Sequence, residues 1–77
     1  MNFSKWLHQS LIIKGMNQAT LAKKIKVHRS VVCNWVGGKH LPEPRRLLVL
    51  ADILQLDNQE TIDMLQSIIN SLQETKC

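Results

Sequence analysis

Two short helical segments that lie close together in the middle of the chain constrain the fold more than any other feature. Residues 18–25 and 29–36 each show apolar residues at helical spacing for about two turns, and about three residues separate them. Helices this short are not stable in isolation, so packing against the rest of the chain must hold them. A tight turn between them needs a small residue where they cross, and Ala22 stands at that position.

Three further segments with helical periodicity flank this pair. Their predicted bounds are about 2–14, 44–55 and 57–73, marked by residues that favour helix ends: Gly15, Pro44 and the capping box Asp57 and Glu60. Asn17 can cap the segment 18–25. The alternation typical of strands is missing. The sequence therefore predicts an all-α bundle of about five short helices in a single domain, residues 1–77.

Basic and acidic residues are concentrated in different halves of the chain. Residues 1–46 contain nine Lys and Arg and one acid, Glu43, for a net charge of +8. Residues 47–77 contain one Lys and five acids, for a net charge of −4. This asymmetry indicates one surface for an anionic polymer and another for something else, although charges that only solvate different helices would give the same division.

Composition argues against several classes of protein. The apolar runs are far shorter than the roughly 20 residues of a membrane span, and the N-terminus lacks the order of a secretion signal. Two cysteines are too few for a disulfide framework and fit a reducing compartment, so a cytoplasmic protein is expected. His8, His28 and His40 lack metal-ligand spacing, and no catalytic set of residues is recognisable. We expect no enzyme, no cofactor and no membrane partner.

The middle of the chain resembles a known family. The segment Gly15–Ile25 reads GMNQATLAKKI, and it is followed by Val27, Val32, Trp35, Gly38-Lys39 and Pro44. This pattern is similar to the Cro and phage-repressor (XRE-type) helix-turn-helix family over roughly residues 3–65. The resemblance implies a lambda-repressor-like DNA-binding domain in a bacterial cell or phage-infected host. It would be a transcriptional regulator, most simply a Cro-like repressor, that binds a palindromic double-stranded DNA operator as a homodimer.

The same resemblance leaves alternatives open. A restriction–modification controller protein and an antitoxin, which would also bind a protein partner, are of the same family. A protein-interaction module that keeps the fold without binding DNA belongs to another class.

Two departures from the family pattern affect the turn and the core. Lys26 stands where relatives often have glycine, so either a lysine adopts a left-handed conformation at a cost of about 1 kcal/mol or the turn takes another shape. Leu11 and Val36 stand where many relatives have an ion-paired Arg and Glu. Replacing a buried ion pair by an apolar pair is often neutral or stabilising, so the joint change is compatible with the alignment.

The outer face of segment 29–36 carries the residues predicted to contact bases. Arg29 can bind guanine, Asn34 can bind adenine, and Ser30 can contact either a base or phosphate. Cys33 could meet a thymine methyl group, but a half-buried structural cysteine is favoured. Phosphate contacts are expected from Gln18, His28, Lys39, His40, Arg45 and Arg46. For His28, capping of the helix is an equal alternative.

Segment 57–73 contains an apolar seam with two readings. Ile62, Leu65, Ile69 and Leu72 recur at steps of three and four, and Met64 and Ile68 widen the stripe. The segment could pack only on the first helix, or it could form a dimer contact. We expect it to do both, with Leu65 and Ile68 facing inward and Ile62, Ile69 and Leu72 across the dimer interface.

Overall fold

The computed structural model describes residues 1–74 of the chain. This part folds into five α-helices joined by short loops, and it contains no strand. The helices are α1 (Phe3–Ile13), α2 (Gln18–Ile25), α3 (Arg29–Val36), α4 (Pro44–Ile53) and α5 (Asn58–Glu74). Their bounds lie within two residues of those expected from the sequence. The prediction of an all-α fold with five helices is confirmed.

Side chains next to the helices satisfy backbone groups at their N-terminal ends. The Oδ1 atom of Asn17 accepts a hydrogen bond from the backbone N–H of Thr20 at 2.7 Å, as expected for an N-cap. At the start of α5, Asp57 Oδ1 accepts from the Glu60 N–H at 2.8 Å, and Glu60 Oε1 accepts from the Asp57 N–H at 3.4 Å. This reciprocal pair is the capping box that the sequence predicted. Pro44 occupies the first turn of α4, as predicted.

The connection between α2 and α3 passes through a residue in the left-handed region. Lys26 has φ 61° and ψ 45°, so of the two conformations considered the strained one is present. The strain is accompanied by a closing hydrogen bond, since the Val27 N–H donates to the Ala22 carbonyl at 3.0 Å. The connection between α4 and α5 closes in the same way: Gln55 has φ 53°, and the Leu56 N–H donates to the Ala51 carbonyl at 3.0 Å.

The core is built from side chains of all five helices. Helix α1 packs against α3 and α5, while α2 packs against α3 and α4. Phe3 and Trp6 stack with their ring centroids 5.7 Å apart. Val32 and Trp35 of α3 are buried, whereas Val31 is half-buried.

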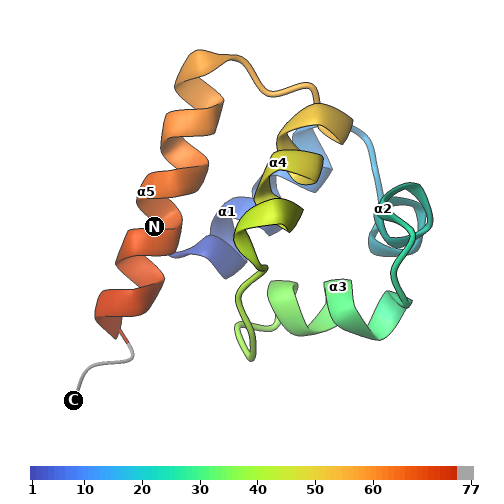
Figure 1. Cartoon of the computed structure of the whole chain (residues 1–77), viewed down its shortest axis with the longest axis horizontal. Coiled ribbons are helices and arrows are strands. Elements are labelled where there is room, and N and C mark those ends of the chain that lie inside the picture. Colours follow the sequence, from blue (N-terminus) through green and yellow to red (C-terminus); the bar gives the residue numbers. More distant parts are fainter. Residues whose placement is uncertain (75–77) are drawn as a thin grey trace.

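Polar contacts tie α5 along the length of α1. The Ser71 hydroxyl accepts from the Phe3 N–H at 2.8 Å, and the Asn70 side chain donates to the Met1 carbonyl at 2.9 Å. At the other end, Lys14 Nζ lies 3.3 Å from Glu60. Figure 1 shows the N-terminus beside α5, in agreement with these bonds. The position of α5 relative to α1 is therefore held at both ends.

The expected direction of Leu65 is wrong. Its side chain is 47% exposed, whereas Met64 and Ser67 are buried and Ile68 is half-buried. Successive residues of a helix point about 100° apart, so a helix that turns Met64, Ser67 and Ser71 toward α1 must turn Leu65 away. Leu65 therefore joins Ile62, Ile69 and Leu72 on the outer face, where all four are about half exposed.

The left-handed turn gives the first prediction. Replacing Lys26 by glycine removes the Cβ strain, and we expect the free energy of unfolding to rise by up to about 1 kcal/mol, because the greater entropy of glycine in the unfolded chain offsets part of the gain. Guanidinium denaturation measures the change. The matched control is Lys24→Gly inside α2, which should lower stability by about 1 kcal/mol. Equal destabilisation by both variants would contradict the strain at Lys26.

Candidate nucleic-acid interface

Helix α3 has one buried face and one exposed face, and the residues predicted to read bases lie on the exposed face or at its border. Val32 and Trp35 are buried, whereas Arg29 and Ser30 are exposed at the N-terminal end of the helix. Steps of three and four residues from Arg29 and Ser30 lead along the same side to residues 33 and 34. The structure thus brings the predicted base-contacting residues to one side of α3.

Cys33 is exposed, so the expectation that it is half-buried is wrong. The physical reason is its position on the helix. It follows Arg29 by four residues and Ser30 by three, which places it on their face and not on that of Val32 and Trp35. We define the exposed stripe of α3 as Arg29, Ser30 and Cys33, bordered by the half-buried Asn34.

Asn34 connects the stripe to the following loop. Its backbone carbonyl accepts from the Lys39 N–H at 2.9 Å and from the His40 N–H at 3.4 Å. These two bonds turn the chain back at the C-terminal end of α3. Lys39 and His40, both exposed and both predicted to contact phosphate, are therefore held beside the C-terminal end of α3.

His28 caps α3. Its Nδ1 atom accepts from the Ser30 N–H at 3.1 Å and lies 2.9 Å from the Ser30 hydroxyl. The side chain is exposed. Of the two roles predicted for it, helix capping and phosphate contact, the structure shows capping.

The other residues predicted to contact phosphate stand on neighbouring helices. Gln18 begins α2 and is half-buried, while Arg45 and Arg46 lie in the first turn of α4. Arg45 Nε is 3.1 Å from a carboxylate oxygen of Glu43, but both side chains are mostly exposed. Such a surface pair contributes little free energy, so Arg45 can exchange Glu43 for another anion at small cost.

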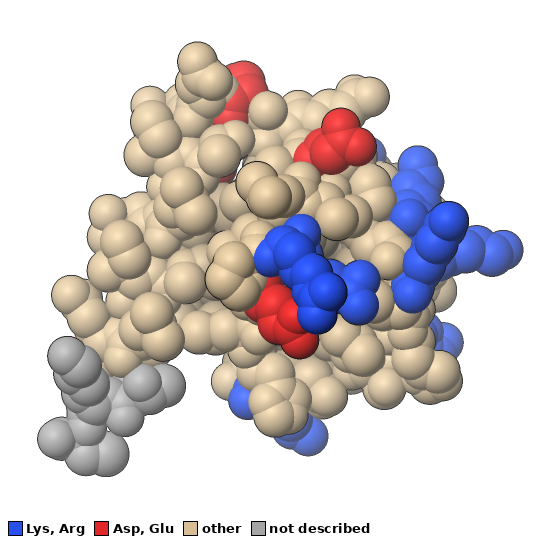
Figure 2. Space-filling view, in the orientation of Figure 1, with Lys and Arg blue, Asp and Glu red and all other residues tan. Residues whose placement is uncertain are grey.

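Charge is distributed unevenly over the surface. In the view of Figure 2, blue Lys and Arg side chains gather over the part of the molecule that Figure 1 assigns to α2, α3 and the start of α4. The surface over α5 in the same view is tan, with acidic groups toward its upper end. The division of charge along the sequence is thus also a division in space on this face.

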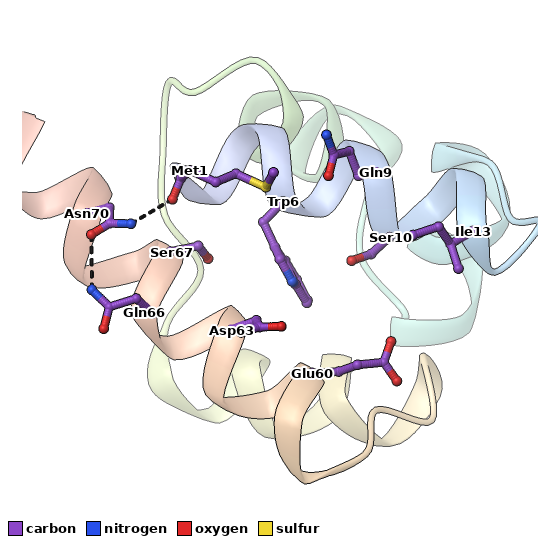
Figure 3. Close-up of a pocket in the computed structure, with 10 residues that line it drawn as sticks. All are labelled: Met1, Trp6, Gln9, Ser10, Ile13, Glu60, Asp63, Gln66, Ser67 and Asn70. Atoms are coloured by element: carbon purple, nitrogen blue, oxygen red, sulfur yellow. Dashed lines mark hydrogen bonds between the residues drawn. The ribbon is translucent and has the colours of Figure 1, made fainter.

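A hollow of about 490 Å³ between α1 and α5 is lined by several polar groups (Figure 3). Among these lining residues we recognise no catalytic arrangement. Trp6 points into it from α1, and Glu60, Asp63 and Ser67 line it from α5. Glu60 is occupied by Lys14 and by the capping box, and the Ser67 hydroxyl donates to the Met64 carbonyl at 2.6 Å. Of these bonds, the Lys14–Glu60 pair joins α5 to the end of α1, and the others lie within α5 and its cap.

Within residues 1–74, no cluster of three or more His, Cys, Asp or Glu could hold a metal ion. Over the same residues, no helix combines the length and apolar character needed to cross a bilayer. Comparisons with protein-family models, with curated proteins and with solved structures found no match to the chain. The case for function therefore rests on the residues of the chain itself.

The exposure of Cys33 can be tested directly. In a Cys77→Ser variant, Cys33 is the one remaining thiol, and we expect it to react stoichiometrically with a chromogenic disulfide reagent under native conditions. Addition of denaturant should raise the extent of reaction little. A thiol that reacts only after unfolding would contradict the exposed position and restore the half-buried one.

Proposed function

We propose that the protein is a sequence-specific DNA-binding transcriptional regulator, a Cro-like repressor in which α2 and α3 form a helix-turn-helix. The observation that carries the proposal is the exposed stripe of α3. Arg29, Ser30 and Cys33 face outward from a short helix whose opposite face is buried. A helix supported in this way can enter the major groove of B-DNA, where base edges are distinguishable.

The chemistry of the stripe suits direct readout of bases. Arg29 can donate two hydrogen bonds to O6 and N7 of guanine, and the amide of Asn34 can pair with N6 and N7 of adenine. Ser30 accepts or donates to several bases, and the small apolar side chain of Cys33 fits a thymine methyl group. In this proposal the combination favours particular sequences.

Residues around the stripe would fix the position of the protein on the DNA backbone. Lys39 and His40 follow α3, and Arg45 and Arg46 begin α4. The N-terminus of α2 at Gln18 adds backbone N–H groups and the positive end of a helix dipole. Contacts of this kind make affinity fall steeply with salt concentration and carry no sequence information directly.

The outer face of α5 supplies a surface for dimerisation. We define the α5 stripe as Ile62, Leu65, Ile69 and Leu72, which are 47–57% exposed. Contiguous exposed apolar side chains of this size mark interaction sites more often than free surface. A second copy would cover the stripe in a symmetric pair, because the same patch then meets itself. Two recognition helices about 34 Å apart would read a palindromic operator and block a promoter.

Selection of bound sites from random double-stranded DNA tests the proposal as a whole. We expect an inverted repeat whose half-sites are centred about one helical turn apart. A single unpaired half-site would refute the dimer while leaving DNA recognition intact. No binding at any salt concentration would refute the DNA-binding function and favour a protein-interaction module.

Arg29 can be tested by two variants that separate charge from hydrogen-bond geometry. Arg29→Ala should weaken binding to the selected site by about 1–3 kcal/mol and relax preference at one base position. Arg29→Lys keeps the positive charge but loses the planar fork, so it should restore general affinity without restoring the base preference. Electrophoretic mobility shifts on matched and single-substituted sites measure both effects. Unchanged discrimination by either variant would exclude Arg29 from readout.

The dimer is tested by placing a charge inside and outside the α5 stripe. Ile69→Glu puts a carboxylate in the apolar contact. It should raise the dissociation constant of the dimer, measured by sedimentation equilibrium, at least tenfold. Gln66→Glu adds the same charge to an exposed position of α5 outside the stripe and should leave association nearly unchanged. Circular dichroism checks that both variants fold. Equal effects of the two variants would count against the stripe as the interface.

A further inference from the structure

The solvent-facing side of α4 carries two large apolar residues that neither the core nor the proposed DNA contacts use. Leu48 is 75% exposed and Val49 is 37% exposed. They share this side of the helix with Arg45 and Asp52, opposite the buried Leu50. A single exposed apolar residue is ordinary, but two neighbours on a face that is otherwise charged form a patch.

This patch is one wall of an open groove between α4 and the end of α2. The groove has a volume of about 540 Å³. Its lining residues are Lys24, Ile25, Lys26, Leu48, Val49, Asp52 and Ile53. Ile25 is buried and Ile53 half-buried, so the base of the groove is apolar as well. We call it the α2–α4 groove.

The charges around the groove are mostly positive. Lys24 and Lys26 are exposed on the α2 side, and Asp52 is the one acid among the lining residues. Arg45 stands on the same side of α4, where it pairs with Glu43. Figure 2 shows blue groups on both sides of the tan surface that lies over α4 and toward α2. A binding partner that matches this surface must combine apolar side chains with negative charge.

We propose that the α2–α4 groove binds an acidic amphipathic helix of a partner protein. Apolar side chains of that helix would enter between Leu48 and Ile53, as in other helix-in-groove complexes. Carboxylates beside them would meet Lys24 and Lys26, which orient the helix and speed its association. The inference does not depend on the proposed DNA-binding function, because none of the seven lining residues belongs to the exposed stripe of α3 or to the α5 stripe.

Two other occupants fit the surface less well. An anionic bilayer would meet the basic residues and Leu48, but it would also meet the carboxylate of Asp52, which lines the groove and is repelled by anionic headgroups. The α5 stripe of a second copy is also apolar and near acidic residues, yet its proposed role already pairs it with itself. Both occupants are distinguishable by experiment.

The test is a titration of the isotope-labelled protein with a synthetic helical peptide of Leu and Glu, with Leu at steps of three and four. We expect amide shifts in the NMR spectrum at residues 24–26 and 48–53, and no binding of the same peptide with Lys in place of Glu. Leu48→Gln should weaken peptide binding about tenfold, because it removes apolar contact while glutamine keeps the helix. Ile12→Gln removes another largely exposed apolar side chain, from α1, and should leave binding unchanged.

Four results of the peptide titration would overturn the proposal. These are no shifts at millimolar peptide, shifts centred on residues 62–72, equal binding of the Lys peptide, and equal effects of the two glutamine variants. Binding to anionic phospholipid vesicles that Leu48→Gln abolishes would assign the groove to a bilayer. Weaker self-association of Leu48→Gln in sedimentation would assign it to a second copy. Leu48→Gln should still bind the selected DNA, because Leu48 is not a proposed DNA contact. Loss of peptide binding with DNA binding retained therefore concerns the groove alone, and the two proposals can fail separately.

Discussion

The burial of the inner face of α3 is the interaction on which the rest of the structure depends. A helix of eight residues has little stability of its own, and α3 persists because Val32 and Trp35 are withdrawn from water against α1 and α2. Burial of side chains of this size contributes about 1.5–3 kcal/mol each. The Ser4 hydroxyl also donates to the Val36 carbonyl, which fixes the last turn of α3 to α1. The outward side chains thereby stand on a rigid support, which would lower the entropy lost in the proposed binding to DNA.

The turn before α3 sets how that support is oriented. Lys26 accepts a left-handed conformation because the Val27 N–H reaches the Ala22 carbonyl, and the buried Ala22 lets the two helices approach closely. The strain is therefore offset by a contact on each side of the turn. The same residue reaches the edge of the α2–α4 groove, so a glycine there would ease the turn and remove one of the cations proposed to hold a partner.

The three surfaces described above are separated by helix geometry. The exposed stripe of α3, the α2–α4 groove and the α5 stripe lie on different helices and share no residue. The two hydrogen bonds between α5 and residues 1 and 3 keep the α5 stripe in a constant relation to α1, which in turn supports α3. If α5 pairs two copies, this connection would transmit the spacing of the dimer to the two α3 helices.

The sequence by itself determined the five helices and most of their ends, because caps such as Asn17 and Asp57 act on neighbouring backbone groups and need no tertiary partner. It also placed Arg29 and Ser30 on one face, since helical periodicity alone relates them. The same spacing puts Cys33 on that face. Only the tertiary structure decided which way Leu65 points and that Leu48 stays in solvent. The apolar stripe of a helix can be wider than the neighbour that covers it, so its buried edge depends on how the helices pack. Local pattern cannot resolve a rotation of about 100°, whereas the packing of α5 on α1 and of α3 on α1 and α2 does.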